Sequence, residues 1–480
     1  MGWHSGMVAV ASAGYGPGCM AARQPRRTRV RRAFLLLPVA LLTTVVSVAL
    51  HPAAAATPVP SAGPTPTAAP SEPAGVDPLP SVAATPEASP TPIVAPSPGP
   101  QAGNPPVVRP PMSITRPRLA PQTRLALQAR LDRLRQRYGI PGISVAIVLP
   151  DGATWSGVSG MADIATRAPV TRETSFAIAS VSKTFTAALI LALAEDGIVD
   201  LDASVRHYLP AVKKISVKIK VRQLLDHTSG LRDFFFHPSI DHQLLSRPAR
   251  RWDATLALRY LGKPYSEPGK SWHYSNTNYL LLGMVAEAAG KKPLADQVQQ
   301  RFLEPLGLDH TWYQPEDPPP TDVAHGYRFT STSTAAPAID LTDGTPLVPF
   351  TSVVTAAGGA GGFASTARDL AHWAQALYGG HVLRPEYLAA MVDPSTTAAL
   401  KSSIPYGYGT QVVEIDGLRT LGHSGRLLGF RSAMRYIPDQ GVSIAVVTNQ
   451  SRTDPAPIVR SLLKLALTPV DRTCVCRVRR

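Results

Sequence analysis

The sequence predicts an α/β (α+β) fold, whose antiparallel sheet is built from both chain ends of one globular domain, residues 119–468. Two observations lead to this prediction. A helix pattern and a hairpin pattern open the domain near residue 122, and three strand patterns followed by a helix pattern close it near residue 467. Between these ends lie mainly helical stretches and long loops rich in proline and glycine. A sheet flanked by the terminal helices, with an inserted and mainly helical lobe, accounts for this order.

The opening helix is predicted over residues 122–138, because leucines recur at helical spacing and Gly139 ends the pattern. An apolar run at 143–148 then predicts a strand. The turn Pro150-Asp151-Gly152 returns the chain into a partner strand that begins at Ala153. The domain therefore starts with a helix and a hairpin.

The closing part of the domain predicts three strands and a helix. The strands cover residues 408–414, 431–437 and 442–449. Turn residues separate them, at Asp416-Gly417 and at Pro438-Asp439-Gln440-Gly441. The last helix is expected over residues 455–467.

Residues 1–56 are predicted to be an export signal. Six arginines and no acidic residue precede an apolar run at 33–50, and four alanines follow at 53–56 in the place of a cleavage site. An uncleaved membrane anchor is the alternative, since the apolar run is at the short limit for spanning a bilayer. The Arg31-Arg32 pair also resembles a twin-arginine signal. The domain is therefore expected outside the cytoplasm, either secreted or associated with the cell wall or membrane.

Two further segments flank the domain. Residues 57–118 alternate proline with Ala, Ser, Thr and Val, a composition that predicts an extended and disordered linker. Residues 469–480 form a basic tail with Cys474-Val475-Cys476, which is too closely spaced for an ordinary intrachain disulfide. Because Cys19 is the only other cysteine and would leave with the signal, no disulfide framework is predicted.

Composition excludes several classes of function. The net charge of +15 falls to +9 without the six arginines of residues 1–56, and basic residues do not cluster with aromatic ones, so no nucleic-acid partner is predicted. A moderately basic surface fits adhesion to anionic wall polymers or lipid, as well as plain solubility. The glycines at 358–362 lack a P-loop lysine. We therefore expect no metal, nucleotide, flavin or other cofactor.

The stretch Ser180-Val181-Ser182-Lys183 is the most informative chemical pattern of the chain. On a helix, residues three apart share one face, so the Lys183 amine can reach the Ser180 hydroxyl. Small and apolar residues follow to position 193, and Asp196-Gly197 supplies a stop, which predicts a buried helix. A nucleophile then lies beside a candidate base. S-x-x-K also arises by chance with a surface lysine, so its meaning depends on the motifs that accompany it.

Two further motifs accompany it. Tyr274-Ser275-Asn276 precedes an apolar helix at 280–289, where side chains can face a cleft; taken alone, this is a turn with an Asn cap. His423-Ser424-Gly425 falls in an expected strand with glycines on both sides of the histidine, which permits close approach of another molecule. Taken alone, His423 is a structural histidine.

Together, the three motifs resemble those of serine hydrolases with the fold of class C β-lactamases and penicillin-binding D-alanyl-D-alanine carboxypeptidases. Tyr274 follows Ser180 by 94 residues, and His423 follows Tyr274 by 149. The resemblance covers roughly residues 122–468. It also includes the stretches 176–179, 201–205, 224–231, 358–362 and 369–370. It implies a β-lactamase/transpeptidase-like fold.

The resemblance also implies roles for individual residues. Ser180, Lys183, Tyr274 and His423 would be catalytic, and Asn276, Ser424, Gly425 and Arg426 would bind substrate. Ser180 would form an acyl-enzyme, whose oxyanion would meet the backbone N–H groups of Ser180 and Arg426. Lys183 and Tyr274 both have reference pKa values near 10, so either could be the general base once its environment lowers that pKa.

The third motif departs from β-lactamases, because His423 stands where class C enzymes carry a lysine. A neutral imidazole attracts a substrate carboxylate weakly, and we hypothesise that Arg426 or Arg431 supplies the charge instead. A histidine at this position resembles the low-molecular-mass carboxypeptidases and related esterases. Together with the predicted export signal and proline-rich linker, it leads us to expect a D-alanyl-D-alanine carboxypeptidase acting on peptidoglycan peptides. An esterase or β-lactamase-type amide hydrolase acting on a small ester or amide is the alternative on the same fold. A non-catalytic cell-wall-binding protein is the alternative of another class.

Overall fold

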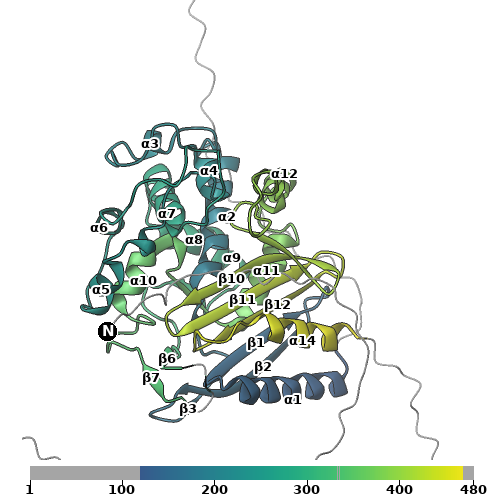
Figure 1. Ribbon diagram of the computed structural model, residues 1–480. Helices are drawn as coiled ribbons and strands as arrows, with labels where there is room; N and C mark the ends of the chain where they lie inside the picture. Colours follow the sequence, from purple (N-terminus) through teal and green to yellow (C-terminus); the bar gives the residue numbers. More distant parts are fainter. Residues whose placement is uncertain (1–118, 332, 334–335, 469–480) are drawn as a thin grey trace, which may run out of the picture. The chain divides into compact units, whose positions relative to one another are not determined.

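The computed structural model describes residues 119–331, 333 and 336–468, which all fall in one structural unit (Figure 1). The predicted signal, the predicted linker and the basic tail all lie outside the described residues. No helix in this part of the chain is long and apolar enough to cross a membrane.

A seven-stranded antiparallel sheet forms the lower part of the domain in Figure 1 and joins the two chain ends, as predicted. The lateral order is β3-β2-β1-β12-β11-β10-β9, so β1 pairs with β12 over six residue pairs from Ile143–Thr448 to Val148–Ser443. The strands are β1 (Gly142–Val148), β2 (Thr154–Asp163), β3 (Ala168–Pro169), β9 (Gln411–Ile415), β10 (Leu418–Leu427), β11 (Phe430–Ile437) and β12 (Val442–Thr448).

Helices cover both faces of this sheet. The terminal helices α1 (Pro121–Tyr138) and α14 (Ala456–Leu467) pack on one face (Figure 1). Helix α11 (Ala367–Tyr378) packs on the opposite face, with α2 (Ser182–Glu195) in the same core. Because both faces are covered, every residue of β1 and of β12 is buried, which explains why these strands read as continuous apolar runs.

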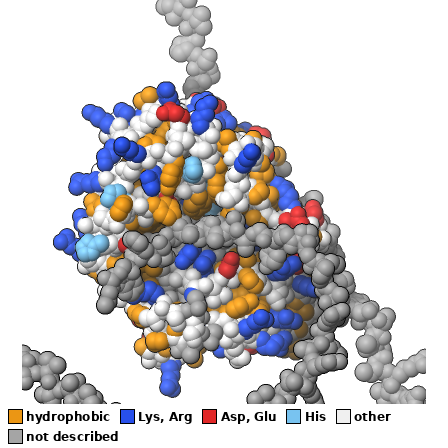
Figure 2. Space-filling view, in the orientation of Figure 1, with side chains coloured by type: hydrophobic (Ala, Val, Ile, Leu, Met, Phe, Trp, Pro, Cys, Tyr) orange, Lys and Arg blue, Asp and Glu red, His pale blue; other side chains and the backbone are white. Residues whose placement is uncertain are grey.

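The inserted lobe is mainly helical, as predicted. Its helices are α3 (Val205–Tyr208), α4 (Val221–Leu225), α5 (Ile240–Leu245), α6 (Ala254–Leu258), α7 (Asn276–Gly290), α8 (Leu294–Val298), α9 (Glu304–Leu306), α10 (Thr351–Ala357), α12 (Pro385–Val392) and α13 (Ser395–Ala399). Two small sheets accompany them, β4 (Phe176–Ala177) with β8 (Phe363–Ser365) and β5 (Trp312–Tyr313), and β6 (Tyr327–Phe329) with β7 (Ala338–Asp340). On the face drawn in Figure 2, Lys and Arg side chains are spread over the surface and outnumber acidic ones.

Three elements begin at other residues than the sequence predicts, and all three lie near the predicted motifs. The strand expected from residue 408 begins at Gln411, because Gly409 adopts a left-handed turn with φ +70°; a Cβ atom there would lie 2.6 Å from Ala187 Cβ. Helix α7 begins at Asn276, four residues before the expected 280. Ser180 lies in a 3₁₀ turn, Ala179–Val181, and the α-helix begins only at Ser182.

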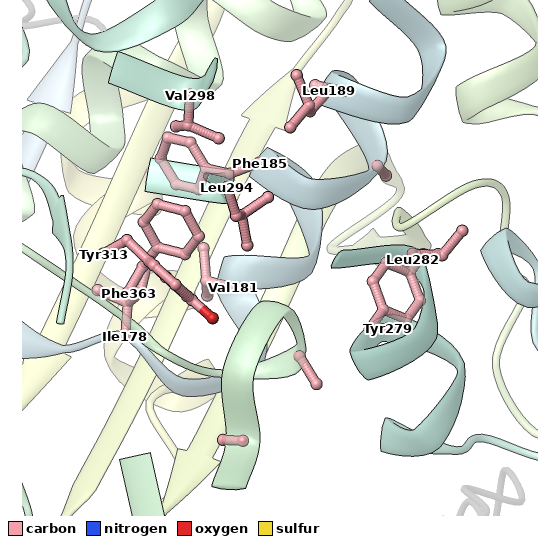
Figure 3. Close-up of a cluster of buried hydrophobic side chains, with 14 of the residues drawn as sticks. Ile178, Val181, Phe185, Leu189, Tyr279, Leu282, Leu294, Val298, Tyr313 and Phe363 are labelled. Atoms are coloured by element: carbon pink, nitrogen blue, oxygen red, sulfur yellow. The ribbon is translucent and has the colours of Figure 1, made fainter. Parts of the chain in front are cut away.

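Aromatic side chains fill the core between α2 and the helices beside it (Figure 3). The Phe185 ring stacks on Trp373 with ring centroids 4.3 Å apart and on Phe363 at 5.2 Å. Phe185 is fully buried. It therefore anchors the helix that carries Lys183 to the core.

Truncating this anchor should destabilise the domain. We expect Phe185→Ala to lower the free energy of unfolding by about 3–5 kcal/mol, because it removes a buried ring and leaves a cavity. Leu125, which is 73% exposed, is the control, and Leu125→Ala should cost about 0.5 kcal/mol or less. Urea unfolding of both variants measures the difference. Equal losses would contradict the assigned packing.

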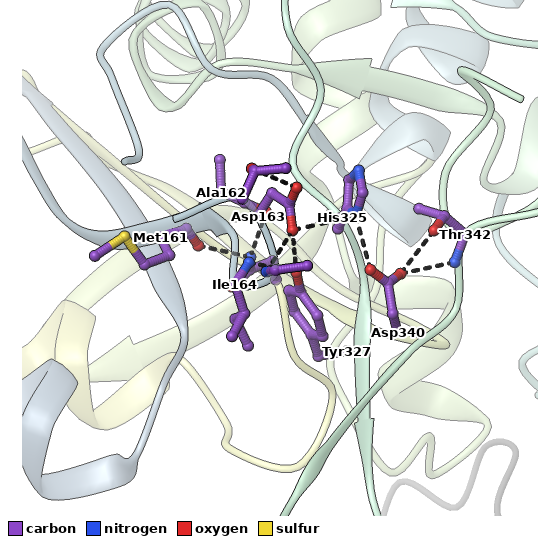
Figure 4. A network of polar contacts seen from close by, with 11 residues as sticks. Met161, Ala162, Asp163, Ile164, His325, Tyr327, Asp340 and Thr342 are labelled. Atoms are coloured by element: carbon purple, nitrogen blue, oxygen red, sulfur yellow. Dashed lines mark hydrogen bonds and ion pairs between the residues drawn. The ribbon is translucent and has the colours of Figure 1, made fainter. Parts of the chain in front are cut away.

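A polar network attaches the β6–β7 hairpin to the end of β2 (Figure 4). The His325 Nδ1 atom lies 2.7 Å from Asp340 Oδ2 and 3.8 Å from Asp163 Oδ1. Tyr327 accepts a hydrogen bond from the Ile164 backbone N–H at 2.8 Å and donates one to Asp163 at 3.4 Å. The network thus ties a segment of the inserted lobe to the sheet.

Candidate active site

A cavity of about 390 Å³ brings the three predicted motifs together. Ser180 comes from the 3₁₀ turn before α2, Tyr274 and Asn276 from the start of α7, and His423 from β10. Its wall also includes Phe235, Trp272, Ala360, Gly361, Tyr406, Gln411, Ser424, Gly425, Arg426, Leu427, Leu428, Arg431, Ser451 and Asp454. All the predicted site residues except the buried Lys183 line this one cavity.

The close approach of β10 to the serine turn depends on Gly425. A Cβ atom at this position would collide with the Ile178 carbonyl oxygen and the Ser432 hydroxyl. The strand can therefore pass directly beside the turn that carries Ser180 only if residue 425 lacks a side chain. Arg426, one residue further on, lies at the cavity wall.

Lys183 is fully buried and makes three short contacts. Its Nζ atom lies 3.1 Å from Ser180 Oγ, 2.7 Å from Asn276 Oδ1 and 2.7 Å from the Ala360 carbonyl oxygen. The last two atoms only accept hydrogen bonds here, so a neutral amine gives them its two N–H groups and keeps its lone pair toward Ser180. This geometry suits proton transfer from Ser180 to Lys183.

Burial also separates the two candidate bases. Desolvation lowers the pKa of Lys183 to about 7, although the negative charge of Asp233 opposes part of this shift. Desolvation raises the pKa of Tyr274 above its ordinary value, and a hydrogen bond with Ser180 offsets only part of the rise. Near neutral pH, Tyr274 therefore stays protonated, while a large fraction of Lys183 is neutral. Of the two candidate bases, these shifts favour Lys183.

Asp233, which was not among the residues predicted from the sequence, supports Asn276. Its carboxylate accepts hydrogen bonds from the Asn276 backbone N–H at 3.0 Å and from Asn276 Nδ2 at 2.7 Å. Asp233 follows the stretch 224–231 by two residues and is only 1% exposed. No motif marks it. An aspartate directly before three phenylalanines is the one signal that could have drawn attention to it, because a buried carboxylate needs partners.

His423 is buried, and both of its ring nitrogens are engaged. Nδ1 lies 2.7 Å from the Ser424 carbonyl oxygen, which requires an N–H there, and Nε2 lies 2.9 Å from the Tyr406 hydroxyl, which then donates. Desolvation and the nearby Lys183 hold the pKa of His423 well below its usual value. The ring is therefore neutral and fixed in one tautomer, so it contributes shape and polarity to the wall rather than charge.

Charge at the cavity wall comes from Arg426 and Arg431 together with Asp454. Arg426 and Arg431 are paired across β10 and β11, and Arg431 donates through Nε to the Ser451 carbonyl oxygen at 2.9 Å. With His423 neutral, the wall carries more positive than negative charge.

The Ser424 hydroxyl donates a hydrogen bond to Gln411 Oε1 at 3.2 Å. The same oxygen accepts a hydrogen bond from the buried Arg435 at 2.9 Å.

One group of metal-type ligands occurs in the described residues, namely Asp163, His325 and Asp340. It is the network that attaches the β6–β7 hairpin, and none of its members lines the cavity. Its polar atoms are bonded to one another and to neighbouring groups (Figure 4). It therefore has a structural explanation that needs no ion.

The described domain is similar to several known proteins. A family model described as Beta-lactamase matches residues 127–468. A D-aminopeptidase of Cereibacter sphaeroides is 28% identical over 71% of this chain and 63% of its own length. Penicillin-binding protein 4 of Amycolatopsis lactamdurans is 27% identical over 67% of this chain and 84% of its own. The chain thus spans less than two thirds of the D-aminopeptidases that it matches.

Solved structures show the same fold. The D-amino acid amidase from Ochrobactrum anthropi SV3 superposes with a TM-score of 0.61 and 27% identity, over 72% of this chain and 98% of that one. A D-stereospecific amidohydrolase from Streptomyces sp. gives 0.60 and 27%, over 72% and 97%. Both support the β-lactamase/transpeptidase-like fold. The family match, the fold and the motifs lead to one conclusion: the chain belongs to the β-lactamase and penicillin-binding protein family of serine hydrolases.

Proposed function

We propose that this chain hydrolyses an amide bond through an acyl-enzyme on Ser180, with Lys183 as the general base. The observation that carries the proposal is the position of the Lys183 amine, whose two N–H groups are used by Asn276 and Ala360 while its third direction faces Ser180. A serine hydroxyl needs such a base to attack a carbonyl carbon.

In the acylation step, Ser180 Oγ bonds to the substrate carbonyl carbon as its proton passes to Lys183. Tyr274, which remains protonated and is hydrogen-bonded to Ser180, then donates a proton to the departing amine and recovers one from Lys183. Water repeats the attack on the acyl-enzyme and releases the acid. In both steps the backbone N–H groups of Ser180 and Arg426 would receive the negative charge on the carbonyl oxygen.

The charge of the cavity favours a peptide with a free carboxylate, and hence the D-alanyl-D-alanine carboxypeptidase activity. Arg426 and Arg431 both lie at the wall, and guanidinium groups bind carboxylates through charge-assisted hydrogen bonds. Because His423 is neutral, these arginines would take over the attraction that a lysine in the third motif provides.

Hydrolysis of D-amino acid amides or of peptides with a D-residue at the amino end is the second candidate. Asp454 is a carboxylate at the same wall, suited to a substrate ammonium group. Relatives named D-aminopeptidase and D-amino acid amidase favour this candidate. An acyl-D-Ala-D-Ala tripeptide and D-alanine amide, assayed in parallel, would separate the two. Hydrolysis of the tripeptide alone, detected as released D-alanine, supports the carboxypeptidase. Hydrolysis of D-alanine amide alone, detected as released ammonia, supports the amidase.

The two arginines give a further prediction. We expect Arg431→Gln to raise KM for the acyl-D-Ala-D-Ala tripeptide by about tenfold or more, because a hydrogen bond to a charged group is worth about 1.5–3 kcal/mol. The same peptide with an amidated C-terminus is the control, and its KM should change little. Arg426→Gln tests the neighbouring guanidinium in the same way. An unchanged KM for the free acid in both variants would exclude carboxylate binding by this pair.

We also propose that the chain acts outside the cytoplasm. The support is the sequence of residues 1–56, with its arginines, apolar run and alanines. Fractionation of cells that express the full chain, followed by N-terminal sequencing of the recovered protein, tests both export and cleavage. Recovery from the cytoplasm alone would contradict export.

A further inference from the structure

The carboxylate of Asp233 is joined to Lys183 through a single side chain. It accepts three hydrogen bonds from N–H groups: from Asn276 N at 3.0 Å, from Asn276 Nδ2 at 2.7 Å and from Phe235 N at 3.0 Å. Burial raises the pKa of Asp233 above its ordinary value, and the three N–H donors together with the nearby Lys183 oppose this by favouring the ionised carboxylate. A negative charge is thus held in the protein interior next to the catalytic machinery.

Asp233 determines which way the Asn276 amide points. Because Nδ2 donates to Asp233, Oδ1 must face Lys183, from which it accepts a hydrogen bond at 2.7 Å. The opposite orientation would set the amide N–H groups against those of Lys183 and the amide oxygen against the carboxylate. The direction of the Lys183 lone pair therefore depends on Asp233 through Asn276.

The other titratable groups around Lys183 carry no charge near neutral pH. Burial raises the pKa of Tyr274 and of Tyr279, and burial lowers the pKa of His227 and of His423, so all four are neutral. In the described part of the chain, Asp233 is the charged group that acts on Lys183.

We propose that Asp233 is a positioning residue of this active site: it orients Asn276, and its buried charge stabilises the ammonium group that forms when Lys183 takes the Ser180 proton. The inference rests on the function proposed above, in which Lys183 is the base. The active site would then contain a chain of contacts that runs from Ser180 to Lys183, from Lys183 to Asn276 and from Asn276 to Asp233.

The test is a titration of Lys183 itself. In full-length protein labelled with ¹³C-lysine, the ¹³Cε resonance of Lys183, assigned with Lys183→Arg, reports its protonation. A nearby charge shifts a pKa by about one unit or more, so Asp233→Asn should lower the pKa of Lys183 by at least about one unit, and Asp233→Glu should restore much of it. Asp369→Asn is the matched control, because Asp369 is also buried but bonds His310 and Thr311.

Kinetics give a second readout. In Asp233→Asn, the fall of kcat/KM at acid pH should occur at a lower pH than in the native chain. The maximal kcat/KM should also be lower, because the ammonium form of Lys183 is less stable without the charge of Asp233. If Asp233→Asn does not fold, the smaller and uncharged Asp233→Ser takes its place. An unchanged Lys183 titration in the uncharged variants, or an equal shift in Asp369→Asn, would overturn the proposal. The titration needs no turnover, so it tests Asp233 even if Ser180 proves not to act on an amide.

Discussion

Ser180→Ala should abolish turnover of amide and ester substrates, with kcat reduced by about 10⁴-fold or more, since removal of a nucleophile leaves only binding and oxyanion stabilisation. The same change should abolish the covalent adduct with benzylpenicillin, because Ser180 Oγ is the atom that lies 3.1 Å from the Lys183 amine. Intact mass spectrometry of the full chain after exposure to benzylpenicillin measures the adduct, and release of p-nitrophenol from p-nitrophenyl acetate measures turnover.

Ser182→Ala is the control for this prediction. Ser182 belongs to the same motif, but its hydroxyl accepts a hydrogen bond from the Phe363 backbone N–H at 3.2 Å. The variant should therefore lose stability and still form the adduct. An adduct that persists in Ser180→Ala would identify another nucleophile. Absence of both adduct and turnover in the native chain would favour the non-catalytic wall-binding alternative.

Lys183→Met should reduce kcat/KM by about 10³-fold, because general-base catalysis contributes about 10²–10⁴-fold. In the native chain, kcat/KM should rise with pH through about 7 and then level off, since burial lowers the pKa of Lys183 to about 7 and only the neutral amine accepts a proton. Below that pH the amine is protonated and activity falls. Stopped-flow acylation rates between pH 5 and 9 measure both effects.

The exposed Lys270→Met is the control for loss of a lysine, and it should leave the profile in place. If Tyr274 were the base, activity would instead rise only at strongly alkaline pH, because burial raises the pKa of Tyr274. A profile that is flat through pH 7 would contradict the assignment of Lys183.

Much of the fold could be predicted from the sequence, because buried strands and terminal helices leave strong local patterns. The hairpin at the start and the three strands at the end were predicted within a few residues of β1, β2, β9, β11 and β12. The order of the elements predicted one sheet built from both chain ends, but not which strands pair, because the pairing of β1 with β12 joins residues about 300 positions apart. The predicted boundaries were wrong where contacts between distant segments determine the backbone conformation, as at the left-handed Gly409 and in the 3₁₀ turn that contains Ser180.

The site was predictable only where residues act in short motifs. Ser180, Lys183 and Asn276 could be found because their spacing is local and their chemistry is distinctive, and the structure brings them within hydrogen-bond distance. Asp233 and Tyr406 could not, because each acts on a residue outside its own stretch of sequence, Asp233 on Asn276 and Tyr406 on His423. The neutral state of His423 likewise depends on burial, which no single motif encodes.

The pairing of β1 with β12 has a consequence for synthesis of the chain. The middle of the sheet closes only when residues 442–448 pair with residues 142–148, so the contact order is high and the loop to be closed is long. During translation, the edge of β1 that later pairs with β12 stays unpaired until β12 has been made. Strand β10, which contributes to the cavity wall, is also one of the last strands to be made. Nascent chains truncated before residue 442 should therefore depend on chaperones, because they lack β12, the strand that joins β1 to β11.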